Sequence, residues 1–299
     1  MRVFVTGATG WVGSAVVQEL ITGGHEVRGL VRSDAGAAAL AATGAEVHRG
    51  SLEDLESLRS GVATVDGVIH TAFNHDFSKF AENAATEGHA IEALGAGLEG
   101  SGRPLVITSG VAFMPPGRIA TEDDAHVPRP SFPRNPEGPT HALVLRGVRA
   151  SLIRLPPSVH GQGDHGFVPR LIAIAREQGV SAYIGDGLNR WPAVHRFDAA
   201  RLYRMVLEHR AAGRRYHAVA EEGVPFKDIA GVIGRCLNVP IVALAPERAA
   251  EHFGAFARFA GIDVSASSER TRALIGWAPS GPGLLADLEA GHYFGNPTP

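Results

Sequence analysis

Three glycines near the start of the sequence have the spacing of a phosphate-binding turn. Gly7, Gly10 and Gly13 stand in VFVTGATGWVG, after an apolar run and before a helical one. In such a turn the first glycine permits the tight bend, the second lets backbone approach a diphosphate, and the third lets helix pack on strand. The positive end of the helix then faces the phosphates. The pattern therefore predicts a dinucleotide site rather than an ordinary glycine-rich turn. Its expected residues are Thr6, Gly7, Thr9, Gly10, Trp11, Val12 and Gly13.

The end of the second apolar run bears on which dinucleotide binds. The segment GLVRSD places Arg32 and Ser33 before Asp34, about where the residue that distinguishes the two nicotinamide cofactors is expected. An acidic side chain there accepts a hydrogen bond from the ribose 2′-hydroxyl, whereas an arginine pairs with a 2′-phosphate. Arg32 and Ser33 therefore favour NADP(H). A shift of one register position would make Asp34 the ribose ligand and favour NAD(H).

Apolar strand-like runs alternate with helical patterns through the first half of the chain. Strands are expected at residues 2–7, 25–33, 45–52, 65–73, 103–110 and 147–156, and helices at 12–24, 34–44, 52–62 and 78–100. Strands that alternate with helices pair in parallel through right-handed crossovers. The fold class predicted is therefore α/β, a doubly wound parallel (Rossmann) sheet, with a smaller C-terminal α/β domain.

The alternation becomes less regular after residue 157. We expect residues 1–160 to form the NADP-binding Rossmann domain, with 191–220 returning to it. Residues 161–299 would mainly form the substrate-binding and C-terminal domain. Segment 114–139 is rich in proline and is expected to be an ordered surface loop that acts as a lid or a substrate wall.

Composition excludes several classes of protein. A net charge of -3 over 299 residues argues against a nucleic-acid partner held through its phosphates. The chain has no apolar run long enough for a membrane span, and MRVFVTGATG enters a strand with no basic leader, so a cytoplasmic location is expected. A single cysteine, Cys236, excludes disulfides and thiolate metal clusters within one chain. Histidines without i, i+4 pairing predict no metal site.

Several further motifs point to one family. They are GSLED (50–54), DGVIHTA (66–72), LVITSGVAF (105–113), IRLPPSVHG (153–161) and WPAVHRFDAARL (191–202). With the glycine pattern, they make the chain similar to an extended or atypical short-chain dehydrogenase/reductase of the NAD(P)-dependent epimerase/dehydratase type. The resemblance covers essentially the whole chain, and the N-terminal motif and RLPPSVHG are its most specific parts.

The resemblance implies cofactor contacts in three further segments. The segment at the end of the third strand would lie beside the adenine, although the family usually has aspartate at the position of Ser51. The turn after the fourth strand would line the ribose-phosphate channel, and the turn after the sixth would cover the nicotinamide. The residues concerned are Ser51, Leu52, Thr71, Ala72, Phe73, Pro156, Pro157, Ser158 and Val159.

The catalytic residues match the family only in part. Ser109 matches the family's catalytic serine or threonine, which donates a hydrogen bond to a developing oxyanion. The family's Tyr-x-x-x-Lys pair, which places both side chains on one helix face, is expected near Arg129 and Pro133. Neither residue can do that chemistry, and no tyrosine in the chain is followed four residues later by lysine.

Two histidines are candidates to replace the missing tyrosine as proton donor. His165 follows the sixth strand in the glycine-rich GQGDHGF, and His75 follows the fourth strand in AFNHDFSKF. Both segments are expected at the carboxyl edge of the sheet, where ligands bind. A histidine pKa lies near neutrality, which suits proton transfer. The alternative for each is an exposed loop histidine, as it is for His141 on the helix that lost the tyrosine.

Three functions remain open at this point. The first is an NADPH-dependent oxidoreductase that reduces a small carbonyl or related C=X substrate by hydride transfer, with a non-standard proton donor. The second is a non-catalytic NADP(H)-binding redox sensor, which the missing tyrosine and lysine favour. The third is a sugar-nucleotide epimerase or dehydratase, a reaction that depends strongly on that tyrosine. The expected partners are a small-molecule substrate and, from the resemblance, a second copy of the chain in a homodimer.

Overall fold

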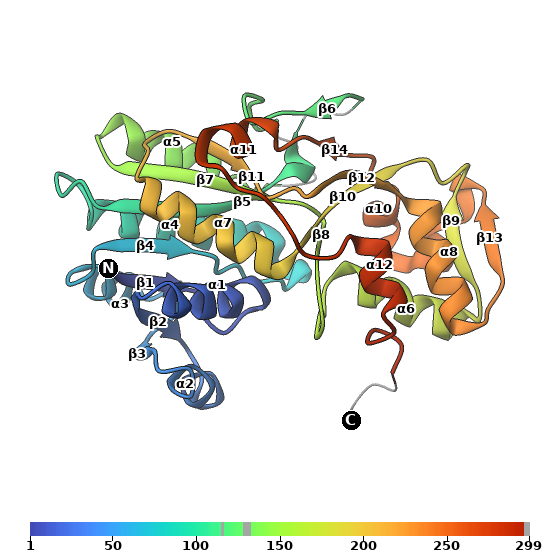
Figure 1. Ribbon diagram of the computed structural model, residues 1–299, viewed down its shortest axis with the longest axis horizontal. Coiled ribbons are helices and arrows are strands. Elements are labelled where there is room, and N and C mark those ends of the chain that lie inside the picture. The colour runs from blue at the N-terminus through green and yellow to red at the C-terminus, as the bar shows by residue number, and fades with distance from the viewer. Residues whose placement is uncertain (115–116, 128–132, 296–299) are drawn as a thin grey trace.

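The central element is a parallel sheet with helices on both faces. The computed structural model describes residues 1–114, 117–127 and 133–295. Within these residues seven parallel strands lie in the order β11-β7-β5-β4-β1-β2-β3 (Figure 1). The strand order reverses between β1 and β4, which is where a doubly wound sheet binds its ligand. The strands are β1 Arg2–Thr6, β2 Glu26–Val31, β3 Glu46–Arg49, β4 Gly67–His70, β5 Pro104–Gly110, β7 Arg149–Leu155 and β11 Arg215–His217.

Two layers of helices bury the faces of this sheet. On one face α1 packs against α7, with Val16, Leu20 and Leu202 in their shared core. On the other face α3, α4 and α5 pack together around Leu58, Leu94 and other apolar side chains. The helices and the 3-10 turns that adjoin them are α1 Trp11–Thr22, α2 Asp34–Ala41, α3 Leu55–Val62, η1 Phe77–Lys79, α4 Phe80–Ala96, η2 Val111–Phe113, α5 Glu137–Leu145 and α7 Arg196–His209.

The C-terminal part contains smaller sheets and its own aromatic core. Trp191 is fully buried there, with its ring centroid 5.0 Å from that of Phe226. In this part β10 lies between β12 and β8, β13 pairs with β9, and β14 pairs with β6. The elements are β6 Ile119–Ala120, β8 Ser158–His160, α6 Phe167–Gln178, β9 Ser181–Ile184, β10 Arg190–His195, β12 Glu221–Pro225, α8 Phe226–Leu237, β13 Ile241–Leu244, η3 Pro246–Arg248, α9 Ala249–Phe253, η4 Gly254–Phe256, α10 Ala257–Ala260, β14 Ser265–Ala266, α11 Glu269–Ile275 and α12 Leu284–Glu289.

This arrangement confirms the predicted α/β class with a doubly wound sheet and a smaller C-terminal part. The chain crosses between the two parts more than once. Strand β10 lies in a small sheet, whereas the next two elements, α7 and β11, return to the main sheet (Figure 1). The division into two domains at residue 160 stays a prediction.

A buried arginine connects several segments at the β7 edge. The Arg154 side chain is fully buried and donates to both carboxylate oxygens of Glu137, at 2.8 Å each, and to the carbonyl of Asp124 at 2.7 Å. Burial lowers the pKa of the adjacent His217 to about 4, so its ring is neutral near pH 7. The neutral ring lies between the Ser267 carbonyl, 2.7 Å from Nδ1, and Arg154, 3.2 Å from Nε2. The ion pair thus joins β7, α5, β11 and two loops.

We predict that Arg154→Met destabilises the fold by about 3–5 kcal/mol, because Glu137 would be left as a buried charge without its counter-ion. Urea unfolding measures the change in free energy. Arg149→Met is the matched control, since Arg149 lies on the same strand and is exposed. It should change stability by no more than about 0.5 kcal/mol. Equal losses in the two variants would contradict a structural role for the Arg154–Glu137 pair.

Candidate functional site

The turn between β1 and α1 leaves no room for side chains at two of its glycines. Gly7 has a φ of +70°, and a Cβ at Gly13 would lie 2.0 Å from the Gly7 carbonyl oxygen. A Cβ at Gly7 would lie 2.8 Å from the backbone nitrogen of Ala72. The Thr71 hydroxyl donates to the carbonyl of Thr6 at 2.8 Å, which ties the turn to the end of β4. The predicted cofactor residues of these two strands therefore form one cradle.

The first turn of α1 presents its backbone N–H groups to this cradle. Gly10 caps the helix without a side chain, and no acidic residue stands in the first turn. The N–H groups that begin a helix have no partner inside it, and they carry the positive end of its dipole. The cradle and the helix end together fit the diphosphate of a dinucleotide.

The residues predicted to choose between the two cofactors lie just after β2. Arg32 is exposed, and the hydroxyl of Ser33 accepts from the backbone of Gly36 at 3.1 Å, so Ser33 caps α2. Asp34 is the first residue of that helix, and its carboxylate pairs with Arg49 at 2.6 Å. The neighbouring Ser51 and Arg32 both lower the pKa of Glu53, through a hydrogen bond and through charge, respectively. Arg32, Ser33 and Ser51 therefore surround the same end of the sheet.

The turn over the expected nicotinamide position is tied to the glycine-rich turn. The indole Nε1 of Trp11 donates to the carbonyl of Val159 at 2.7 Å. Ser158 is buried, and among the described residues its hydroxyl has no hydrogen-bond partner. Pro156 and Pro157 connect β7 to β8 at this point. A buried polar atom without a partner beside the cradle is consistent with a bound polar group.

Ser109 lies at the predicted edge of the sheet but faces an unexpected partner. Its side chain is only 1% exposed, and its hydroxyl donates to Oε1 of Glu137 at 3.1 Å. A serine has one hydroxyl hydrogen, so this bond directs it toward Glu137. The sequence reasoning did not single out Glu137. The available signal was an acidic residue directly after Pro136, at the expected start of a helix.

The predicted position of the lost Tyr-x-x-x-Lys pair was wrong. Helix α5 begins at Glu137, so Pro133 precedes it, and Arg129 lies outside the described residues. The expected position is counted back from β7, and this count misses the effect of the prolines on the start of the helix. Pro136 occupies the N-cap of α5. The i, i+4 pair in the first turn, next to Ser109, consists of Glu137 and His141. His141 itself is exposed.

The structure brings the two candidate histidines to the same edge of the sheet. The His75 ring centroid lies 5.2 Å from that of Phe73, and the His165 ring centroid 5.6 Å from that of Trp11. Both histidine side chains are exposed, as the alternative of exposed loop histidines predicts. Desolvation by the neighbouring side chains lowers the pKa of His75, and Arg134 and His165 lower it further. His165 therefore contributes to the electrostatic surroundings of His75 beside the predicted cofactor turns, although the two residues are far apart in the sequence.

Arg134 forms a wall of this site and was missed by the sequence reasoning. Its guanidinium lies 4.3 Å above the ring of Phe73. It donates to both oxygens of the buried Glu87, at 2.8 and 2.6 Å. Burial raises the pKa of Glu87, and the charge of Arg134 opposes that rise. The ion pair fixes Arg134, in the described part of the proline-rich segment, against the site. That the segment acts as a lid or a substrate wall stays a prediction.

Asp164, beside His165, is held by the C-terminal segment. Its carboxylate accepts from the backbone of Gly166 at 2.7 Å and from the hydroxyl of Tyr293 at 3.4 Å. The same Tyr293 hydroxyl accepts from the backbone of Gly161 at 2.9 Å. Burial raises the pKa of Asp164 to about 6. The loop that carries His165 is therefore fixed by contacts on both sides.

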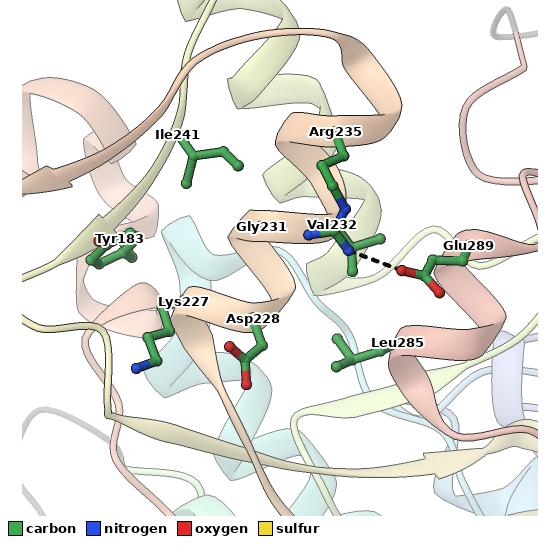
Figure 2. Close-up of a pocket in the computed structure, with 9 residues that line it drawn as sticks. All are labelled: Tyr183, Lys227, Asp228, Gly231, Val232, Arg235, Ile241, Leu285 and Glu289. Carbon is green, nitrogen blue, oxygen red and sulfur yellow. Dashed lines mark hydrogen bonds and ion pairs between the residues drawn. The ribbon is translucent and has the colours of Figure 1, made fainter.

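A separate groove of about 530 Å³ lies on the C-terminal part (Figure 2). It follows one face of α8, where Arg235 pairs with Glu289 at 2.9 Å. None of the predicted cofactor or catalytic residues lines it. Its lining residues are Tyr183, Lys227, Asp228, Gly231, Val232, Arg235, Ile241, Leu285 and Glu289.

The described residues also bear on metal binding and on membrane insertion. No group of three histidine, cysteine, aspartate or glutamate side chains is arranged there to hold a metal ion. Within the same ranges, no helix combines the length and the apolar character needed to cross a membrane.

Comparisons with known proteins agree with this geometry. The NmrA-like family matches residues 1–92. "Uncharacterized protein C2A9.02" of Schizosaccharomyces pombe is 51% identical over 296 residues, which cover 98% of this chain and 100% of the relative. A 2-alkyl-3-oxoalkanoate reductase of Stenotrophomonas maltophilia is 29% identical over 81% of this chain and 77% of its own.

A solved structure shows the same fold. DesIV, a dTDP-glucose 4,6-dehydratase from Streptomyces venezuelae, superposes with a TM-score of 0.79 at 20% identity, over 98% of this chain and 96% of its own. At this identity the likeness concerns the fold alone. The glycine cradle, the doubly wound sheet and these matches lead to one family. The chain belongs to the NmrA-like, atypical short-chain dehydrogenase/reductases, which have an NAD(P)-binding fold of the epimerase/dehydratase type.

Proposed function

We propose that the chain is an NADPH-dependent oxidoreductase that reduces a small carbonyl or related C=X substrate, with a histidine as proton donor. One observation carries the proposal: His75 and His165, from the segments after β4 and β8, lie at the carboxyl edge of the sheet beside Phe73 and Trp11. The relative that is named as a 2-alkyl-3-oxoalkanoate reductase supports chemistry at a ketone. The expected partner is therefore a small-molecule substrate.

The cradle residues would hold the cofactor, and Arg32 would select its phosphorylated form. The carboxylate of Asp34, the competing ligand for a ribose 2′-hydroxyl, pairs with Arg49 at an exposed position. Arg32 and the hydroxyl of Ser33 remain as donors suited to a 2′-phosphate. When bound, the nicotinamide supplies a hydride to the substrate carbon.

Hydride addition leaves negative charge on the substrate oxygen, which then needs a proton. Desolvation and the nearby charge of Arg134 lower the pKa of His75, so less of the protonated donor is present near pH 7 than for an ordinary histidine, and its share rises as the pH falls. His165 stands close enough to influence that protonation and is the second proposed donor. Proton donation by either ring takes the place of the missing tyrosine.

Ser109 is the proposed donor to the developing oxyanion. Its hydroxyl hydrogen points to Glu137 in this structure. Both oxygens of that carboxylate also accept hydrogen bonds from Arg154. Glu137 therefore keeps its hydrogen bonds from Arg154 when the Ser109 hydroxyl rotates toward a substrate. The rotation breaks only the hydrogen bond from Ser109 to Glu137.

The alternative function is a non-catalytic NADP(H)-binding redox sensor. The same bond from Ser109 to Glu137 favours it, since a buried serine already satisfied by a carboxylate is not directed at a substrate. A sensor would bind NADPH and catalyse no hydride transfer, which distinguishes it from the reductase.

The first prediction concerns the proton donors. NADPH consumption over a panel of ketones and aldehydes should show turnover that His75→Gln or His165→Gln lowers by roughly 10²- to 10⁴-fold. If His75 is the donor, the rate should fall as the pH rises through its lowered pKa, and His75→Gln should abolish that dependence. His89→Gln, at an exposed position on α4, is the control. Tight NADPH binding with no turnover on any substrate would favour the sensor.

The second prediction concerns cofactor choice. Arg32→Ala should weaken NADPH binding by roughly ten- to hundredfold, because a charge-assisted contact to the 2′-phosphate is lost. NADH binding should be unchanged, as measured by calorimetric titration. Arg59→Ala, which removes an exposed arginine paired with Glu56 on α3, is the control and should not mimic the loss. Equal losses for NADPH and NADH would refute the assignment of Arg32.

The third prediction concerns Ser109. Ser109→Ala should lower turnover by about 10²-fold and leave NADPH affinity nearly unchanged, since the lost hydrogen bond forms only as charge develops on the substrate. Steady-state rates and a binding titration measure the two effects. An unchanged rate would remove Ser109 from the mechanism and leave it as a structural partner of Glu137.

A further inference from the structure

Arg196 reaches the cofactor cradle from the C-terminal side of the chain. It is the first residue of α7, where the chain returns from β10 to the main sheet. Its guanidinium lies 3.9 Å above the ring of Trp11, and its Nη2 donates to the hydroxyl of Ser14 at 3.0 Å. Trp11 and Ser14 both belong to the first turn of α1. Arg196 therefore lies directly beside the helix end that faces the cradle.

Arg196 differs from the other arginines of α7 in its partners. Arg201 pairs with Asp198, and Arg204 pairs with Glu19 of α1 at 2.8 Å. Within the described ranges no carboxylate forms such a pair with Arg196, and its Nε is buried without an acceptor. Asp164 attracts it only through space, and burial lowers the pKa of the guanidinium. Arg196 is thus a partly buried cation that lacks a close counter-ion.

The surroundings of Arg196 are also positive. The N-terminal end of α1 has no capping side chain and no acidic residue in its first turn. A cation beside the positive end of a helix is unfavourable unless an anion lies near both. The glycine cradle leaves backbone space for such an anion on the same turn.

We propose that Arg196 binds the diphosphate of the dinucleotide and closes the cradle from the side of α7. The inference rests on the dinucleotide site of the proposed function but not on hydride transfer. A planar guanidinium suits phosphate oxygens because it can donate two parallel hydrogen bonds, and stacking on Trp11 fixes its plane. The diphosphate would thus be bound by backbone N–H groups of the β1–α1 turn and by the side chain of Arg196 at the start of α7.

The test separates the two phosphate groups of the cofactor with two probes. ADP-ribose has the diphosphate but no 2′-phosphate. Adenosine 2′-monophosphate has the 2′-phosphate but no diphosphate. In calorimetric titrations Arg196→Gln should bind ADP-ribose roughly ten- to hundredfold more weakly and bind adenosine 2′-monophosphate as the wild type does. Arg32→Ala should show the opposite pattern. Arg196→Lys should restore part of the ADP-ribose affinity, because charge returns without the planar fork.

Arg204→Gln is the matched control. Arg204 lies on the same helix and also bonds to α1, but near its far end, at Glu19. The Arg204→Gln variant should therefore bind ADP-ribose as the wild type does. Wild-type affinity for ADP-ribose in Arg196→Gln would overturn the proposal, as would equal losses in the two variants or an absence of ADP-ribose binding by the wild type. ADP-ribose has no nicotinamide, so these outcomes do not depend on whether the chain is a reductase.

Discussion

The close approach of Gly13 to the carbonyl of Gly7 is the constraint on which the site depends. A side chain at residue 13 would need to occupy space 2.0 Å from that oxygen. The contact sets how near α1 comes to β1, and hence where the first turn of the helix points. Trp11, on that turn, then holds Val159, His165 and Arg196 through a hydrogen bond, a ring contact and a stacked cation, respectively.

Buried ion pairs fix the opposite wall. Arg134 with Glu87 and Arg154 with Glu137 hold both sides of the start of α5, and each pair includes a side chain that is almost fully buried. Breaking such a pair leaves a charge without solvent or partner, so the segment has little freedom to move. Such walls would give the loop histidines the defined geometry that the proposed proton transfer requires.

The site also shows how a family can keep its fold while its catalytic residues change. Glu137 and His141 occupy the first turn of the helix beside Ser109, and Arg154 holds the Glu137 carboxylate there. A carboxylate bound in this way accepts hydrogen bonds from both Arg154 and Ser109. In the proposed reaction the proton comes from another element, through the histidines that follow β4 and β8.

The sequence alone determined the features that depend on neighbouring residues. Glycine spacing, strand and helix alternation and the position of Arg32 after β2 are local, because each follows from backbone geometry within one turn or strand. The position expected for the Tyr-x-x-x-Lys pair was wrong, because α5 begins only at Glu137, after several prolines. A distance counted back from a strand does not show where prolines delay a helix. The partners of Ser109, the contact of Arg134 with Phe73 and the approach of His75 to His165 join residues far apart in the chain. Only the tertiary structure decided these, because they depend on how the sheet and its loops pack together and on no local pattern.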